Sequence, residues 1–378
     1  MTTGPTFARH TIYHGAAAER VLLVVGDLNG DGQPEIVVAS RRGANGLYWL
    51  ERPAGGDWRG EWRMHLMDDA YPSLEAGGVL YDLTGTGTLD FIGGGDFSTR
   101  HVSWWECPDD PAERWTRRLI WSLPGGQCHD QFVADMDGDG RPELYFWNQG
   151  VRRLYGVPVP DDPRVTPWPG VFLVVEDALE EGFAVADVDG DGQAELISGL
   201  SWFRIRPGGA VERHEYATGY VSPRVAAADF SGDGVVEVVI AEGDASYRRA
   251  DSPYGRVVHF GQGGDPEAPW EAQVLHDQLL DPHSVAVADF DGDGRPDLFV
   301  GELGHPGGRD THPPKQRIFY SREGGLVEEI IDQGLGTHEA KAIELDGVTG
   351  IAGKPYRGLR SQVPRTPEID GVQIWMPE

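Results

Sequence analysis

Short apolar runs that alternate with polar positions recur along the whole chain, and many of them meet at an acidic, glycine-rich turn. In the clearest copy, VAVADF (285–290) enters such a turn and DLFVGE (297–302) leaves it. RIFY (317–320) and LVEEIID (326–332) follow as two further runs. Runs of this length, bounded by turn residues, are typical of β-strands. One unit of the pattern therefore predicts four short strands.

The unit occurs seven times along the chain. The first acidic residues of the turns lie 42 to 60 residues apart, at Asp27, Asp82, Asp135, Asp187, Asp229, Asp289 and Glu344. Five turns are well formed, whereas the second has Thr84 and Thr86 in place of its middle acids and the last is vestigial. A repeat of four strands has the size of one β-propeller blade.

The predicted fold class is therefore all-β, a seven-bladed β-propeller formed by residues 1–378 as a single domain. FARHTIY (7–13) shares the pattern of the fourth strand of the other units, and VQIWMPE (372–378) that of a third strand. We expect residues 7–13 to complete the last blade, so that N- and C-terminal strands pair and close the ring. The 53 glycines and 27 prolines fit many strands joined by tight turns.

The Asp-rich turns have the chemistry of a cation site. In the copy that starts at Asp289, carboxylates occupy positions 1, 3, 5 and 9, and a backbone carbonyl at position 7 can complete an oxygen cage. Such hard oxygen ligands favour calcium. We expect five structural calcium sites that tie the first strand to the second, and no metal at Asp82 or Glu344. The candidate ligands are Asp27, Asn29, Asp31, Gln33, Glu35, Asp135, Asp137, Asp139, Arg141, Glu143, Asp187, Asp189, Asp191, Gln193, Glu195, Asp229, Ser231, Asp233, Val235, Glu237, Asp289, Asp291, Asp293, Arg295 and Asp297.

These turns are flanked by strands rather than helices, and they resemble the integrin-like calcium loops of the FG-GAP and VCBS-type repeat families. The resemblance covers nearly the whole chain. It implies a calcium-bearing propeller, and a fold of this kind does not by itself fix the function.

The opposite end of the blades carries the other candidate chemistry. Because the Asp-rich turn joins strands one and two, residues just before strand one and just after strand two must lie at the far end. Six residues before the first acid of its turn, three copies place a histidine and a fourth places Glu181. Thirteen residues after that acid come Glu242 and Glu302, and long insertions (244–256 and 303–317) follow them. We expect these residues to line one funnel.

The candidates in this funnel fall into two groups. His, Tyr or Lys beside carboxylates can remove a proton next to a carbonyl, and the candidate catalytic residues are His129, His283, His338, Glu302, Lys354 and Tyr356. The candidate substrate-binding residues are Arg41, Asp96, Arg224, Glu242, Tyr247, Arg248, His305, His312, Lys315 and Arg357. Two other readings stay open. The three histidines with Glu302 could hold a second divalent metal, or each residue could be a hydrogen-bonded plug at the channel mouth.

The repeats and the funnel are together similar to propeller enzymes of the VCBS-repeat group, including the dehydratase domain of aldos-2-ulose dehydratase and some rhamnose-glucuronate polysaccharide lyases. The resemblance implies a lyase or dehydratase that carries out β-elimination on a keto-sugar or a uronate. It carries over to the histidines before strand one and to GKPY (353–356). A carbohydrate-binding or protein-interaction propeller without catalysis, and another acid/base or metal-assisted enzyme of small molecules, are the alternatives.

Charge narrows the choice of partners. With 61 acidic against 32 basic side chains the formal charge is −29, which would repel nucleic acid and anionic membranes. We therefore expect a small-molecule or oligosaccharide ligand, no nucleic acid and no membrane. The two cysteines, Cys107 and Cys128, are too few for a disulfide framework. The first residues lack the apolar core of a signal peptide, which predicts a cytoplasmic protein.

Overall fold

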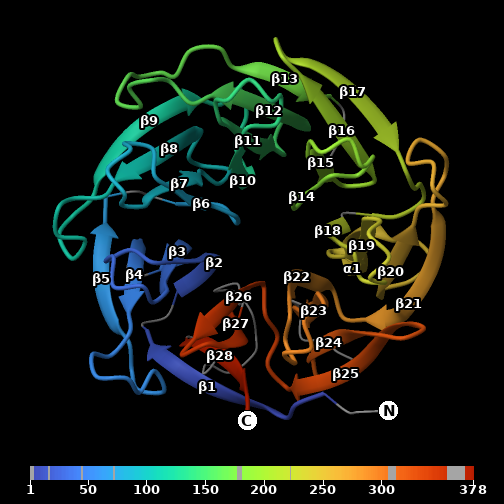
Figure 1. Cartoon of the computed structure of the whole chain (residues 1–378). Helices are drawn as coiled ribbons and strands as arrows, with labels where there is room; N and C mark the ends of the chain where they lie inside the picture. The colour runs from blue at the N-terminus through green and yellow to red at the C-terminus, as the bar shows by residue number, and fades with distance from the viewer. Residues whose placement is uncertain are drawn as a thin grey trace.

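The computed structural model describes residues 4–15, 18–43, 46–70, 73–176, 181–221, 223–304, 312–355 and 371–378. Seven four-stranded antiparallel sheets are arranged in a ring around a central axis (Figure 1). In each sheet the first strand faces the axis and the fourth lies at the rim. The predicted all-β fold with seven blades is therefore confirmed.

Six blades are built from consecutive strands. The first three contain β2 (Ala18–Gly26), β3 (Glu35–Gly43), β4 (Leu47–Glu51) and β5 (Arg63–Asp68); β6 (Val79–Tyr81), β7 (Asp90–Gly94), β8 (His101–Glu106) and β9 (Thr116–Ser122); and β10 (Cys128–Ala134), β11 (Glu143–Asn148), β12 (Arg153–Pro158) and β13 (Phe172–Val175). The next three contain β14 (Ala184–Ala186), β15 (Glu195–Ser198), β16 (Ser201–Arg206) and β17 (Ala210–Glu215); β18 (Pro223–Ala228), β19 (Glu237–Glu242), β20 (Gly255–Gly261) and β21 (Glu271–Leu279); and β22 (Pro282–Ala288), β23 (Asp297–Glu302), β24 (Lys315–Arg322) and β25 (Gly325–Gln333). A single helical turn, α1 (Ala245–Arg248), follows β19.

The seventh blade joins the two ends of the chain. It contains β26 (Glu339–Leu345), β27 (Val348–Lys354), β28 (Gly371–Pro377) and, at the rim, β1 (Phe7–His14). β1 pairs antiparallel with β28, from Phe7 opposite Pro377 to His14 opposite Gly371. The prediction that residues 7–13 complete the last blade is confirmed, and the ring closes through this pairing.

The hydrophobic core lies between neighbouring blades. Seven clusters of buried apolar side chains each combine residues of two adjacent sheets. Between the first and second blades, for example, Trp49 packs with Trp105 and Trp115. Burial of such large apolar surfaces is the main stabilising term of a domain, and here it fixes each inner strand relative to the next. Along the described chain, no helix has the length and apolar character to cross a membrane.

The Asp-rich turns are held by their first carboxylate. Asp289 accepts the backbone N–H of Gly292 at 2.7 Å and that of Gly294 at 2.8 Å. Both glycines have positive φ, +75° and +86°, a region that glycine enters without steric cost. This geometry recurs from blade to blade, whereas the seventh blade has only a tight turn at Asp346 and Gly347 between β26 and β27.

Candidate functional site

A cavity of about 160 Å³ lies where the inner strands begin, at the end of the ring opposite the Asp-rich turns. Inner-strand residues of six blades contribute to its wall. The lining is Ala76, Gly77, Gly78, Asp130, Gln131, Phe132, Gly182, Phe183, Arg224, Val225, His283, Ser284, Val285, His338, Glu339, Ala340 and Lys341. The structure thus brings residues of the predicted histidine offset to one place.

Local irregularities aim polar side chains at the axis. The pairing of β10 with β11 shifts between His129 and Gln131, and that of β22 with β23 shifts between Pro282 and Ser284. A shift of this kind leaves one extra residue, here Asp130 or His283, and re-aims its side chain. Asp130 has φ +42°. A Cβ on Gly77 would lie 2.3 Å from the Cα of Asp130, so the neighbouring blade must have glycine there.

Arg224, at the start of β18, is the hub of the cluster. Its guanidinium donates to Asp130 Oδ2 at 3.2 Å and to His283 Nε2 at 2.9 Å, and it forms an ion pair with Glu181 Oε2 at 2.8 Å. Arg224, Asp130 and Glu181 are all at most 9 % exposed. In a site of such low polarity these charges interact strongly, and the guanidinium joins the third, fourth and sixth blades.

The neighbouring carboxylates keep His129 protonated. Its Nδ1 lies 2.7 Å from Asp130 Oδ2, and its Nε2 lies 3.9 Å from Glu181 Oε1. Burial disfavours the imidazolium, but the charges of Glu181 and Asp130 outweigh burial and raise the pKa of His129 to about 9. Burial likewise opposes ionisation of Glu181, yet Arg224 lowers its pKa to about 2. His129 is therefore a cation and Glu181 an anion at neutral pH.

The other two histidines are uncharged. Burial and then the charge of Arg224 lower the pKa of His283 to about 3, and burial with Lys354 lowers the pKa of His338 well below its usual range. A guanidinium can only donate, so Nε2 of His283 accepts from Arg224 and its proton is on Nδ1. The two rings pack against each other with centroids 4.6 Å apart.

Lys354, at the end of β27, is fully buried behind His338. Its Nζ donates to the carbonyl of Arg20 at 2.9 Å and lies 3.2 Å from His338 Nδ1. Burial lowers the pKa of Lys354 to about 7. The pair of Lys354 and His338 can therefore gain or lose one proton near neutral pH.

The two glutamates that follow the second strands stabilise their own blades. Glu302 is fully buried; one oxygen lies 2.9 Å from Arg317 Nη1 and the other accepts the N–H of Lys315 at 2.7 Å. Glu242 is also fully buried and pairs with Arg256 at 2.7 Å. Neither lines the cavity. These contacts fit a structural role for Glu302 rather than the catalytic one expected from its position.

The remaining candidates either do not line the cavity or lie outside the described residues. Asp96 accepts hydrogen bonds from Ser73, Ser98 and Thr99 within a loop. Arg41 pairs with Glu75 and Glu19, Arg248 with Asp244, and His312 contacts the carbonyl of Pro313. Lys315 contributes its backbone N–H to Glu302. His305, Tyr356 and Arg357, and the side chain of Tyr247, lie outside the described residues.

The cluster does not have the geometry of a second metal site. Across the described part of the chain, groups of three acids, histidines or cysteines close enough to share one ion occur only in the Asp-rich turns. Between His283 and Glu181 the guanidinium of Arg224 already supplies the positive charge.

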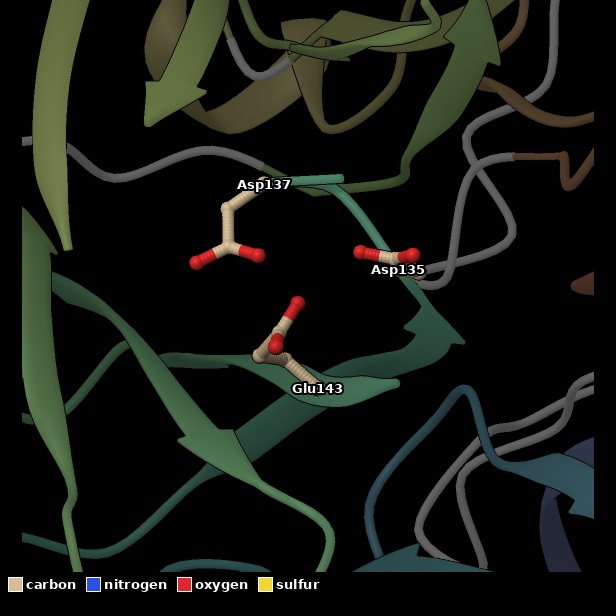
Figure 2. A group of neighbouring side chains, drawn as sticks. All are labelled: Asp135, Asp137 and Glu143. Carbon is tan, nitrogen blue, oxygen red and sulfur yellow. The ribbon is translucent and has the colours of Figure 1, made fainter. Parts of the chain in front are cut away.

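Three Asp-rich turns bring carboxylates together from positions 1, 3 and 9. Figure 2 shows one such group, in which the carboxylates of Asp135, Asp137 and Glu143 point toward one another. The ligand oxygens of each group lie within 4.8 Å of one another; the other two groups are Asp187, Asp189 and Glu195, and Asp289, Asp291 and Asp297. These groups could hold a metal ion.

The donor set of these groups fits a hard cation. Burial, with the neighbouring acids, raises the pKa of Glu143 and of Glu195 to about 7, because carboxylates in such proximity disfavour each other's charge. The turns at Asp27 and Asp229 have Asn29 or Ser231 at position 3 and so offer one carboxylate fewer.

Arginines of the third strands contact two of the three groups. Arg204 of β16 pairs with Asp189, and Arg322 of β24 pairs with Asp291 and, at 3.2 Å, with Asp293. Among the described contacts of Asp135, Asp137 and Glu143 there is no arginine. The three acidic groups therefore differ in how much positive charge the chain itself provides.

Sequence reasoning missed several residues of the cavity. Asp130, Gln131 and Ser284 lie one or two positions beyond the histidine offset, and Glu339 directly follows His338. The signal that could have found Asp130 and Gln131 is the polar run QCHDQ (127–131), because such a run is unusual at the start of a strand that packs inside the ring. The strand irregularity at Asp130 is not visible in the sequence.

Comparison with known proteins supports the repeat and the fold. Residues 282–311 match the family described as FG-GAP repeat, and no curated protein matches the sequence. A virginiamycin B lyase from Staphylococcus aureus is similar in structure, with a TM-score of 0.57, 11% identity and coverage of 98% of this chain and 99% of that one. An exotype rhamnogalacturonan lyase has a TM-score of 0.51 at 14% identity, over 98% and 76% of the two chains. A biofilm matrix protein of V. cholerae has a TM-score of 0.54 at 11% identity, over 99% and 91%.

The predicted resemblance to FG-GAP-type propellers is thus confirmed. At such low identity the similar structures show the fold alone. Lyases and a matrix protein share this architecture with the chain.

Proposed function

We propose that the protein is an acid/base lyase that carries out β-elimination on a keto-sugar or a uronate at the central cavity. The observation that carries the proposal is the divergence of ionisation states within one buried cluster: His129 is charged, His283 and His338 are neutral, and Lys354 titrates near neutrality. Environments that push the pKa values of neighbouring groups apart are a mark of acid/base sites.

In this proposal His338 and Lys354 act together as the base. When Lys354 is neutral, its amine can accept a hydrogen bond from Nδ1 of His338, which leaves the lone pair on Nε2 of His338 for the substrate. His338 lines the cavity, whereas Lys354 lies behind it. A proton taken from the carbon next to a carbonyl or carboxylate can therefore be shared with the lysine.

Arg224 is the group that stabilises the developing negative charge. It lines the cavity and is held rigidly by Asp130 and Glu181, and its Nε–H, which has no hydrogen-bond partner in the protein, is a preorganised donor for the carbonyl oxygen on which charge develops. The carbon–oxygen bond at the β position then breaks as the double bond forms. The leaving oxygen takes the proton back from His338 and Lys354 and departs as water from a keto-sugar, or as the hydroxyl of the released sugar from an oligosaccharide. One unsaturated product forms, and the protein returns to its starting state.

We also propose that calcium is held by the five well-formed turns, with a structural role. The oxygen donors and their spacing support this identity for the ion. When bound, calcium would supply positive charge that ties the first strand of a blade to the second.

The experiment follows ultraviolet absorbance of conjugated products while the protein is offered keto-sugars and uronate oligosaccharides. We expect turnover in the wild type and a loss of at least roughly 100-fold in His338→Gln or Lys354→Met, the range typical of removing a general base. His101→Gln is the matched control, because His101 is exposed on β8, its ring lies 3.5 Å from Ser122 Oγ, and it does not line the cavity. Binding without turnover across all substrates would refute the lyase and favour a carbohydrate-binding propeller.

A further inference from the structure

We infer that the cavity selects an uncharged, polyhydroxylated carbonyl compound over an anionic sugar. This inference rests on the proposed function and chooses between the keto-sugar and the uronate that it leaves open. Two features of the wall support it. Its charged groups are paired with each other, and its polar atoms without a hydrogen-bond partner can each exchange one hydrogen bond with an uncharged ligand.

The charges of the wall balance within the protein. Asp130 and Glu339 are the acids among the lining residues, and Arg224 and Lys341 are the bases. Arg224 contacts Asp130 at 3.2 Å, and Lys341 lies 3.3 Å from Glu339. A carboxylate entering this space would have to compete with Asp130 and Glu339 for cations that are already paired. Such an exchange gains little Coulomb energy and leaves like charges close together.

Several buried polar atoms of the wall have no hydrogen-bond partner within the protein, although Asp244 Oδ1 lies 3.9 Å from one of them, His283 Nδ1. These atoms are Gln131 Oε1, Ser284 Oγ, Arg224 Nε and His283 Nδ1. Each belongs to a lining residue that is at most 7 % exposed. The set contains an acceptor, two N–H donors and a hydroxyl that can do either. Unsatisfied buried groups cost free energy, and sugar hydroxyl and carbonyl groups are complementary to this mixture.

The volume limits the part of the ligand that reacts. At about 160 Å³ the cavity has room for roughly 11–16 water-sized units, at about 10–15 Å³ each. One sugar ring has about as many non-hydrogen atoms. The reacting unit is therefore a single ring or an open-chain sugar of similar size.

Glu339 is the residue through which this selectivity can be tested. It is 8 % exposed, begins β26, and accepts the N–H of Leu23 at 3.2 Å in addition to its contact with Lys341. Glu339→Gln keeps the shape and can keep the acceptor for Leu23, but it removes one negative charge and releases Lys341. The variant should therefore bind an anionic ligand better than the wild type does.

The experiment compares methyl glucuronoside with its methyl ester by titration calorimetry, because the two compounds share one skeleton and differ by one charge. In the wild type we expect the ester to bind at least roughly tenfold more tightly, and in Glu339→Gln we expect the ratio to fall to about threefold or less, as one like charge is removed. Glu344→Gln is the matched control: it removes the same charge from the exposed end of the same strand and should leave the ratio unchanged.

The outcomes separate this inference from the lyase proposal. Equal or tighter binding of the acid in the wild type, or failure to bind either compound, would overturn the inference. A ratio that Glu339→Gln leaves unchanged would overturn it as well. Turnover of uronates alone in the absorbance assay would leave the lyase standing and refute the selectivity. Ester preference without turnover of neutral keto-sugars would refute the lyase and leave the ligand class standing.

Discussion

Replacing Lys354 by Met should stabilise the folded protein at pH 6 even though it removes a group that we assign to the chemistry. Lys354 is fully buried, and its Nζ contacts the carbonyl of Arg20 and Nδ1 of His338. A buried ammonium with neutral partners is costly. Methionine has a similar length and no charge, so it removes that cost.

The magnitude follows from the pKa. Burial lowers the pKa of Lys354 from 10.5 to about 7, and at about 1.4 kcal/mol per pKa unit this corresponds to roughly 5 kcal/mol as an upper bound. The variant loses two hydrogen bonds and leaves the carbonyl of Arg20 without its partner, which costs about 1–3 kcal/mol. We therefore expect Lys354→Met to be more stable than the wild type by roughly 2 kcal/mol at pH 6.

The sign of this difference should reverse with pH. Between pH 7 and 10.5 the unfolded chain holds the lysine proton and the folded protein does not, so the wild type gains stability as the pH rises. Below pH 7 both states hold the proton, and this contribution is constant. Lys354→Met lacks this rise of about 1.4 kcal/mol per pH unit, so the two proteins should be equally stable near pH ~8.5 and Lys354→Met should be the less stable one at pH ~9.5.

Urea unfolding of both proteins at pH 6 and pH 9.5 measures the effect. Lys341→Met is the control, because Lys341 is 42% exposed and pairs with Glu339 in the same blade, and its difference from the wild type should hardly depend on pH. If Lys354→Met is destabilised equally at both pH values, the lysine is not the poorly solvated ammonium that the structure indicates.

Three further predictions concern other parts of the molecule. Protonated His129, whose pKa is raised to about 9, contributes its full stabilisation below pH ~6.5, and this contribution is lost between pH ~6.5 and ~9. In thermal unfolding, the Tm of His129→Gln should therefore fall less over this pH range than the Tm of the wild type. Glu302→Gln should cost about 1–3 kcal/mol in urea unfolding because it removes one of the two carboxylates that pair with the buried Arg317 and leaves only Glu328, and the double variant with Arg317→Met should cost less. Asp137→Asn should lower calcium affinity at least roughly tenfold by calorimetry and reduce the rise in Tm that calcium produces.

The fold followed from the sequence because its determinants are local and repeated. The apolar run before Asp289 and the run from Asp297 each indicate a strand, and the turn between them needs glycines at fixed positions because its backbone has positive φ there. The split seventh blade was predictable as well, because residues 7–13 have the pattern of a rim strand with no preceding strands of their own.

The candidate site was predictable only in part. The common offset of His129, His283 and His338 placed them at the correct end, because every inner strand has the same direction. The strand irregularity that turns Asp130 toward the axis depends on pairing between strands, and no residue type marks it.

The sequence contains a signal for the ion pair of Glu302 with Arg317. Glu302 is followed after 15 residues by Arg317, and Glu242 after 14 residues by Arg256. Since the second and third strands are antiparallel neighbours, these spacings bring each arginine back to its glutamate. A spacing analysis across strands would have assigned both glutamates to ion pairs within their blades.

The pairing of β1 with β28 also bears on how the ring assembles. Phe7 and Pro377 are opposite each other although they are 370 positions apart in the chain, so their contact closes a very long loop and cannot form before residue 377 has been synthesised. Until then the last blade has three strands and an open edge. A ribosome-bound chain would therefore have six complete blades in an open ring. Pairing of β1 with β28 would then cover the exposed strand edge, which is prone to aggregation. We expect chaperones to act chiefly on this last step.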